Sequence, residues 1–87
     1  MILTIDVGNT NITCGVFQGD EIAASFRITT KMPRTSDEYG MMLLNLLEQN
    51  DIHPTEIKDA IICSVVPELS DTMKQAFIKV TGITPML

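Results

Sequence analysis

Residues 2–11 read Ile2-Leu3-Thr4-Ile5-Asp6-Val7-Gly8-Asn9-Thr10-Asn11, and a second apolar run follows at once. An apolar strand that ends in a carboxylate, a glycine and small polar residues is typical of a tight β-hairpin. Glycine can adopt a positive φ or another strained conformation at such a turn without a Cβ penalty. The successive backbone N–H groups of a turn can form a concavity that binds anions. This order of residues therefore predicts a hairpin whose tip could hold phosphate.

The same residues also fit a plain hairpin, because Asn and Gly are the usual turn residues between two strands. Asp6 favours the phosphate site, since a carboxylate at the end of an apolar strand is poorly placed for simple packing and would need a partner if it were buried. A hydrated Mg²⁺ held against the phosphates would be such a partner, although solvent at the strand end would serve as well. Asn9, Thr10 and Asn11 would add amide and hydroxyl donors.

The chain has 87 residues, which is enough for one small domain or for part of a larger one. Its net charge of −5 argues against nucleic acid as a partner, because no basic stripe exists to neutralise a phosphate backbone. The densest basic stretch contains Arg27, Lys31 and Arg34. We expect these three side chains to flank a loop and not to line a groove.

The sequence shows no signal peptide and no apolar stretch near the ~18 residues that a membrane helix needs. We therefore expect a cytoplasmic protein without a membrane partner. Cys14 and Cys63 both lie in apolar, strand-like runs and are far apart in sequence. They are predicted to be small reduced core residues, and not a metal pair or a redox motif.

Three strands are predicted over residues 2–7, 12–18 and 21–29. The pair Gly19-Asp20 fits a two-residue turn between the second strand and the third. Strands joined by such short turns form an antiparallel meander.

A helix is predicted from the capping box Thr35-Ser36-Asp37-Glu38 to about Gln49. Acidic residues in its first turn suit the helix dipole. Its apolar residues cover more than one narrow stripe, so we expect it to contact the sheet and a second partner, either a later part of the chain or another subunit. These apolar residues are Tyr39, Met41, Met42, Leu43, Leu44, Leu46 and Leu47.

Residues 51–59 form a polar connection with the lone His53, which is predicted to be solvated. Residues 60–66 form a continuous apolar run without alternation. Such a run is typical of a central parallel strand that is covered on both faces.

Pro67 ends that strand and can open a second helix. This helix is predicted to end at Gly82, and residues 83–87 look like the start of another strand. Apolar residues recur along it at helical spacing, at Met73, Ala76, Phe77 and Val80. The order β-β-β-α-β-α predicts an α/β fold with a mixed sheet, in the ribonuclease-H-like arrangement, that is incomplete at the C-terminus.

Three segments together carry a resemblance to a known family. Residues 6–11, 34–39 and 64–67 read Asp-Val-Gly-Asn-Thr-Asn, Arg-Thr-Ser-Asp-Glu-Tyr and Ser-Val-Val-Pro. In this order and spacing they resemble the N-terminal part of type III pantothenate kinase. The resemblance implies an actin-like ATPase fold of the acetate kinase, sugar kinase, Hsp70 and actin superfamily. Residues 1–87 would then be the N-terminal part of the first domain, with the second domain absent.

The resemblance also implies an activity, namely the ATP-dependent phosphorylation of pantothenate to 4'-phosphopantothenate in the first step of coenzyme A biosynthesis. Family members act as cytoplasmic homodimers on ATP and pantothenate. They need Mg²⁺ and a monovalent cation, K⁺ or NH₄⁺.

Carried over by position, Asp6 would hold Mg²⁺. The segment that would hold ATP and its phosphates comprises Asp6, Val7, Gly8, Asn9, Thr10, Asn11, Ile12 and Thr13. A substrate role for the other two segments is weaker, because helix capping and strand termination already explain their residues. The family's Gly-x-Asp-Arg motif with the catalytic base is expected after Leu87, so the chain alone is expected to be inactive.

Two other functions remain open. Another kinase of the same superfamily could share the hairpin. A truncated homologue without catalytic activity could act as a nucleotide-binding or regulatory module.

Overall fold

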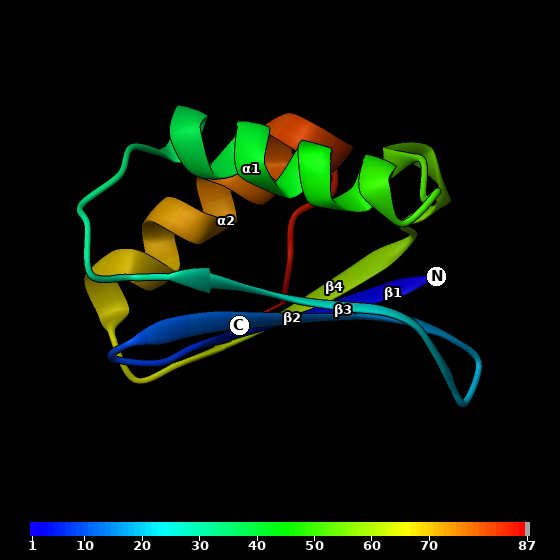
Figure 1. Ribbon diagram of the computed structural model, residues 1–87, viewed down its shortest axis with the longest axis horizontal. Coiled ribbons are helices and arrows are strands. Elements are labelled where there is room, and N and C mark those ends of the chain that lie inside the picture. The colour runs from blue at the N-terminus through cyan, green and yellow to red at the C-terminus, as the bar shows by residue number, and fades with distance from the viewer. Residues whose placement is uncertain (87) are drawn as a thin grey trace.

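The computed structural model describes residues 1–86 and contains one four-stranded sheet with both α-helices on the same face (Figure 1). The elements in chain order are β1 (Ile2–Val7), β2 (Asn11–Gln18), β3 (Glu21–Thr29), α1 (Ser36–Gln49), the 3₁₀ helix η1 (Pro54–Glu56), β4 (Asp59–Ser64) and α2 (Pro67–Thr81). The predicted order of strands and helices is confirmed.

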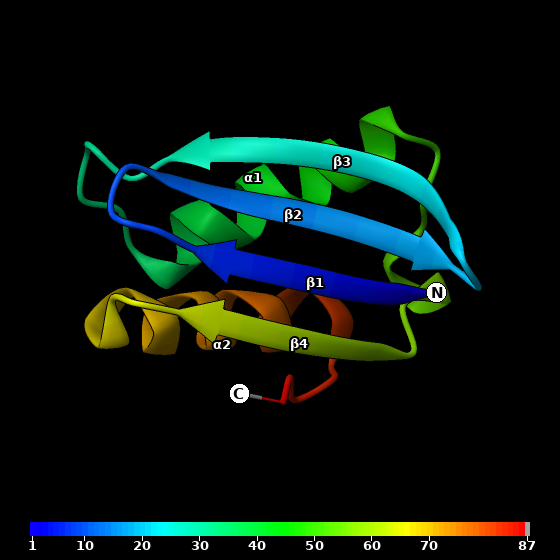
Figure 2. The same cartoon turned by 90° about the horizontal axis from the view of Figure 1, so that it is seen from below.

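The strands lie in the order β3-β2-β1-β4 (Figure 2). β1, β2 and β3 pair antiparallel as a meander, whereas β4 pairs parallel to β1. This parallel pairing needs a crossover, and α1 and η1 lie within it. The sheet is therefore mixed, as the sequence predicted.

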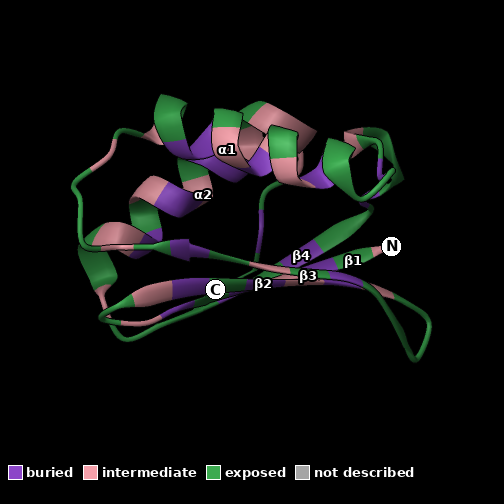
Figure 3. Ribbon diagram, viewed as in Figure 1, coloured by how far each residue is buried: buried purple, intermediate pink, exposed green. Residues whose placement is uncertain are grey.

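The core lies between the sheet and the helices, because successive side chains of a strand point to opposite faces. In β1 the side chains of Leu3, Ile5 and Val7 are buried against the helices. Asp6 is on the other face, which no helix in residues 1–86 covers (Figure 3). The largest fully buried side chains beyond β1 are Tyr39, Phe77, Ile12, Leu43, Leu47, Ile57 and Met73.

The N-terminus of α1 has the predicted capping box. The Thr35 hydroxyl accepts from the Glu38 N–H at 3.2 Å, and the Glu38 carboxylate accepts from the Thr35 N–H at 2.9 Å. The second partner of this helix is α2, a later part of the chain. The two helices pack closely at Gly40, where an added Cβ would lie 3.6 Å from the Ala76 carbonyl oxygen.

Gly40→Ala is expected to stabilise the protein by about 0.5–1 kcal/mol, because alanine loses less conformational entropy than glycine inside a helix. The added methyl would lie 3.6 Å from both the Ala76 oxygen and the Val80 Cγ2, which is ordinary contact. Urea unfolding at 25 °C measures the change. A loss of stability would show that the two helices cannot accept the methyl.

The prediction that residues 60–66 are covered on both faces is wrong for the described chain. β4 ends at Ser64, and Ala60 and Ile62 face the core, whereas Ile61 is 40% exposed. The helices cover only one face of the sheet. Every second side chain of β4 therefore lies on the open face, although the run shows no polar alternation. The strand is parallel, as predicted, but within residues 1–86 it is the last strand of the sheet and not a central one, with only the isolated bridge to Met86 beyond it.

The prediction for the cysteines is half right. Both are free thiols, and Cys14 is fully buried. Burial raises the pKa of the Cys14 thiol to about 12, which keeps it protonated and unreactive. Cys63 is exposed, because it falls on the open face of β4.

The predicted end of α2 is confirmed at Gly82, which adopts a left-handed φ of 76°. Of the strand predicted to start over residues 83–87, the described residues contain an isolated parallel bridge from Met86 to Ile61 beside β4. Leu87 lies outside the described residues. None of the helices in residues 1–86 is long and apolar enough to cross a membrane.

Candidate functional site

Three connections meet at one edge of the sheet (Figure 2). They are the β1–β2 turn, the loop between β3 and α1, and the link between β4 and α2. The carboxyl ends of the parallel strands β1 and β4 lie at this edge. In open α/β sheets ligands bind in the crevice outside the carboxyl ends of the strands. The predicted hairpin tip is therefore at the edge where a ligand is expected.

The β1–β2 turn is held through its carbonyl groups. The Gly8 N–H donates to the Asn11 carbonyl at 2.9 Å. Thr30, just after β3, donates its N–H to the Thr10 carbonyl at 3.0 Å and its hydroxyl to the Asn9 carbonyl at 2.9 Å. Within residues 1–86 the N–H groups of Asn9 and Thr10 have no acceptor. The tip therefore offers unpaired donors while its acceptors are occupied.

Gly8 does not use a positive φ, unlike Gly19 and Gly82. It is needed for close approach, because a Cβ at this position would lie 3.2 Å from the Asn11 carbonyl oxygen. That oxygen accepts the hydrogen bond that closes the turn. The sequence thus correctly predicted that this turn needs glycine. The reason is the lack of space for a Cβ and not a positive φ.

Gly8→Ala is expected to destabilise the protein by about 1–2 kcal/mol, because the methyl crowds a backbone oxygen that cannot rotate away. Urea unfolding measures this loss. The same substitution at Gly40 serves as the control, since there the methyl has ordinary contacts and the expected sign is opposite. Equal changes at the two glycines would contradict the crowding at the turn.

Asp6 and Thr13 are opposite each other in the β1–β2 register, and both are exposed on the open face. Asp6 forms no ion pair with any residue of 1–86. The side chains of Val7 and Ile12 are fully buried in the core. Of the predicted site residues, these two can therefore contact a ligand only through backbone atoms.

The loop after β3 is anchored by Arg34. Its Nη1 donates to the Thr29 carbonyl at 2.6 Å, and its guanidinium carbon lies 5.8 Å from the ring centroid of Tyr39. Tyr39 is buried in α1. Lys31 is exposed in this loop, whereas Arg27 lies within β3 and Arg34 lines the cavity described below. The prediction that these three residues flank a loop and line no groove is therefore correct only for Lys31.

The link between β4 and α2 is tied to the same edge. The Val65 N–H donates to the Val7 carbonyl at 3.2 Å. The Ser64 hydroxyl donates to the Val66 carbonyl and accepts from the Val66 N–H, both at 2.9 Å. Pro67 then begins α2, as predicted.

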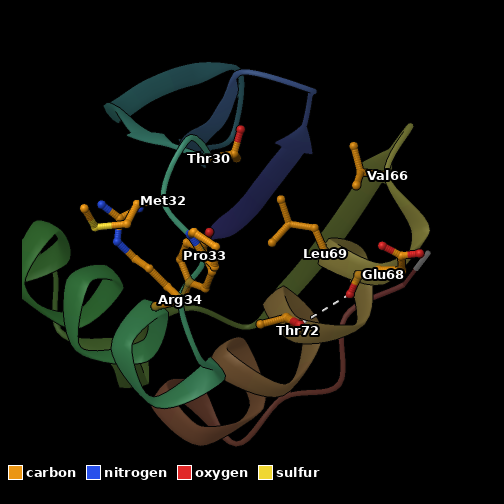
Figure 4. A pocket seen from close by; sticks show the side chains of 9 residues that line it. Thr30, Met32, Pro33, Arg34, Val66, Glu68, Leu69 and Thr72 are labelled. Atoms are coloured by element: carbon orange, nitrogen blue, oxygen red, sulfur yellow. Dashed lines mark hydrogen bonds between the residues drawn. The ribbon is translucent and has the colours of Figure 1, made fainter.

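A cavity of about 230 Å³ lies between the loop after β3 and the first turns of α2 (Figure 4). Its lining residues are Thr30, Met32, Pro33, Arg34, Tyr39, Val66, Glu68, Leu69 and Thr72. None of residues 6–13 lines it. Thr30 joins the two features, because it lines the cavity and also binds the hairpin carbonyls. Sequence reasoning missed the cavity, although segments 34–39 and 64–67 flank it.

His53 does not belong to this edge. It is exposed and precedes β4 at the opposite end of the sheet, where its Nδ1 accepts from the Thr55 N–H. The prediction of a solvated histidine is confirmed. No group of three or more metal-ligating side chains occurs within residues 1–86.

Comparison with known proteins gives a consistent result. A family model described as type III pantothenate kinase matches residues 2–87. A type III pantothenate kinase from Agathobacter rectalis is 63% identical over all 87 residues, and one from Bifidobacterium longum subsp. infantis is 44% identical. In both cases the match covers the whole of this chain but 34% of the relative. The chain thus spans about a third of the length of the curated relatives it matches.

A solved structure, that of a ROK hexokinase from Thermus thermophilus, shares the fold with a TM-score of 0.69. The match covers 99% of this chain and 34% of the hexokinase, at 14% sequence identity. At that identity the likeness concerns the fold alone. The predicted fold class, an actin-like ATPase fold with a mixed sheet, is confirmed.

Proposed function

The chain belongs to the type III pantothenate kinase family, and from that premise we propose that it supplies the phosphate-binding hairpin of an enzyme that phosphorylates pantothenate with ATP. The product would be 4'-phosphopantothenate, in the first step of coenzyme A biosynthesis. Residues 1–87 would be the N-terminal part of the first of two actin-like domains. The protein would act in the cytoplasm as a homodimer.

The observation that carries this proposal is the arrangement of the hairpin tip. The Asn9 and Thr10 carbonyls are bound by Thr30, whereas the N–H groups of the same two residues have no acceptor within residues 1–86. Phosphoryl transfer depends mainly on positioning and on neutralising the charge of phosphate oxygens. Fixed backbone donors at an exposed edge meet both needs, and the side chains of Asn11 and Thr13 lie beside them.

Asp6 suits a magnesium ion. Its carboxylate is exposed and is not engaged in an ion pair within residues 1–86, and Asp6 is the next-to-last residue of β1, the strand that leads to the tip. Mg²⁺ is usually held by one or two carboxylates together with waters and substrate phosphates, so a single carboxylate is sufficient. When bound, the ion would neutralise charge on the phosphate oxygens. We also propose that the enzyme needs the monovalent cation of the family, K⁺ or NH₄⁺. We assign no residue of this chain as its ligand.

We place the catalytic base outside residues 1–87, together with the pantothenate pocket and most of the homodimer interface. The one histidine, His53, lies at the edge of the sheet opposite the hairpin. The chain alone is therefore proposed to bind the nucleotide and not to transfer its phosphate.

The test is a calorimetric titration of the 87-residue chain with Mg·ATP, with adenosine as the matched control ligand. We expect Mg·ATP to bind and adenosine to bind far more weakly, since the hairpin contacts phosphate. Absence of Mg·ATP binding, or equal binding of adenosine, would contradict the proposal.

A second test joins residues 1–87 to the remaining two thirds of a relative's sequence. We expect this longer protein to phosphorylate pantothenate. If it phosphorylates acetate or a sugar instead, the protein is another kinase of the superfamily. If it binds nucleotide without turnover, the protein is a regulatory module.

A further inference from the structure

We infer that Thr30 is a positioning residue for nucleotide phosphate, because it sets the direction of the hairpin N–H groups. This inference rests on the proposed function, since it concerns how the same hairpin receives phosphate. Thr30 lies outside all three segments that carry the family resemblance, 20 positions after Thr10 in sequence.

The peptide group is planar, so the direction of each carbonyl fixes the direction of the N–H that follows it. In a trans peptide the C=O and the following N–H point in opposite directions. The Thr30 hydroxyl holds the Asn9 carbonyl at 2.9 Å, so the N–H of Thr10 is turned away from the end of β3. The Thr30 N–H holds the Thr10 carbonyl at 3.0 Å and turns the N–H of Asn11 away in the same manner. Thr30 thus orients the unpaired N–H of Thr10 and the N–H of Asn11 that follows it.

Thr30 is itself held in place. The preceding carbonyl, that of Thr29, accepts from Arg34 at 2.6 Å, and the Arg34 guanidinium lies over the buried ring of Tyr39. On its other side Thr30 lines the cavity against α2 (Figure 4). The exposed tip is therefore fixed through the loop to the helical layer. Donors that are fixed before binding lose less conformational entropy when phosphate arrives.

Thr30 can be altered without removing both contacts. Thr30→Val keeps the shape and the backbone N–H but removes the hydroxyl bond to the Asn9 carbonyl. Thr30→Ser keeps the hydroxyl and the N–H. A matched control is Thr81→Val, because the Thr81 hydroxyl also donates to a backbone carbonyl at 2.9 Å, that of Phe77, far from the hairpin.

The experiment measures Mg·ATP affinity of the four proteins by calorimetry, well below their melting temperatures. We expect Thr30→Val to weaken binding about three- to tenfold, as the loss of one net hydrogen bond does. Thr30→Ser and Thr81→Val should bind as the parent does. In parallel, ¹⁵N relaxation should show lower backbone order parameters at Asn9 to Asn11 in Thr30→Val and in none of the other three proteins.

The outcomes separate this inference from the proposed function. If the parent binds Mg·ATP and Thr30→Val binds it equally well, the inference fails and the proposed function stands. If Thr81→Val loses as much affinity as Thr30→Val, the effect is one of general stability, and the positioning role is overturned. If the parent binds no Mg·ATP, the proposed function fails, and the inference that depends on it fails too.

Discussion

Asp6→Asn is expected to remove most of the Mg²⁺ dependence of ATP binding. Asparagine keeps the size of the side chain and an oxygen, but it lacks the negative charge that a hard cation needs. Loss of one charge-assisted contact costs about 1.5–3 kcal/mol, or about ten- to a hundredfold in Kd. Titrations with ATP at saturating Mg²⁺ and in EDTA measure the effect. The parent should bind ATP more tightly with Mg²⁺ than in EDTA, and the variant should bind ATP with nearly the same affinity in both conditions.

The chain offers a matched control in Asp20. This residue is also an exposed carboxylate, but it lies in the β2–β3 turn at the opposite end of the meander. Asp20→Asn changes the net charge equally and should leave the Mg²⁺ dependence intact. If the two variants bind ATP alike, Asp6 has no specific role in metal binding.

Phe77→Ala is expected to cause the largest loss of stability, about 3–5 kcal/mol. Phe77 is fully buried, in the part of α2 that packs on the core. The truncation leaves a cavity that a small domain cannot fill by relaxation. The free energy of unfolding of a protein domain is about 5–15 kcal/mol, and small domains are only marginally stable. The variant should therefore be partly unfolded at 37 °C. Urea unfolding at 25 °C, followed by circular dichroism, measures the loss.

Phe17→Ala provides the comparison for this effect. Phe17 is an aromatic residue of β2 that is only partly buried, and it lies on the open face of the sheet. Its truncation removes less buried area, so we expect a loss of about 1 kcal/mol. Equal losses at the two positions would mean that the helical layer does not form the core described above.

The strands and helices could be predicted from the sequence because their signals are local. An apolar run that leads into a glycine and small polar residues marks β1, and the capping box at Thr35 marks the start of α1 within one residue. The exposure of Cys63 and Ile61 could not be predicted in this way. Whether a strand is covered on one face or on two depends on how many layers pack against it, and an apolar run looks the same in both cases.

The candidate site could be predicted only in part, for a similar reason. Residues 6–13 are contiguous, so their chemistry is visible in one stretch. The roles of Thr30 and Arg34 depend on hydrogen bonds to backbone carbonyls, and such acceptors have no sequence signature. The cavity depends on the meeting of the β3–α1 loop with α2, which only the tertiary fold creates.

The parallel pairing of β1 with β4 has a consequence for how the chain folds. The register joins Ile2 to Asp59, so more than half of the chain must be synthesised before this contact can form. The meander can form early, because its contacts are short in sequence. During synthesis, one side of β1 therefore remains an unpaired strand edge until the ribosome has released β4. Nascent chains that stall within α1 would expose that edge to other strands and to aggregation.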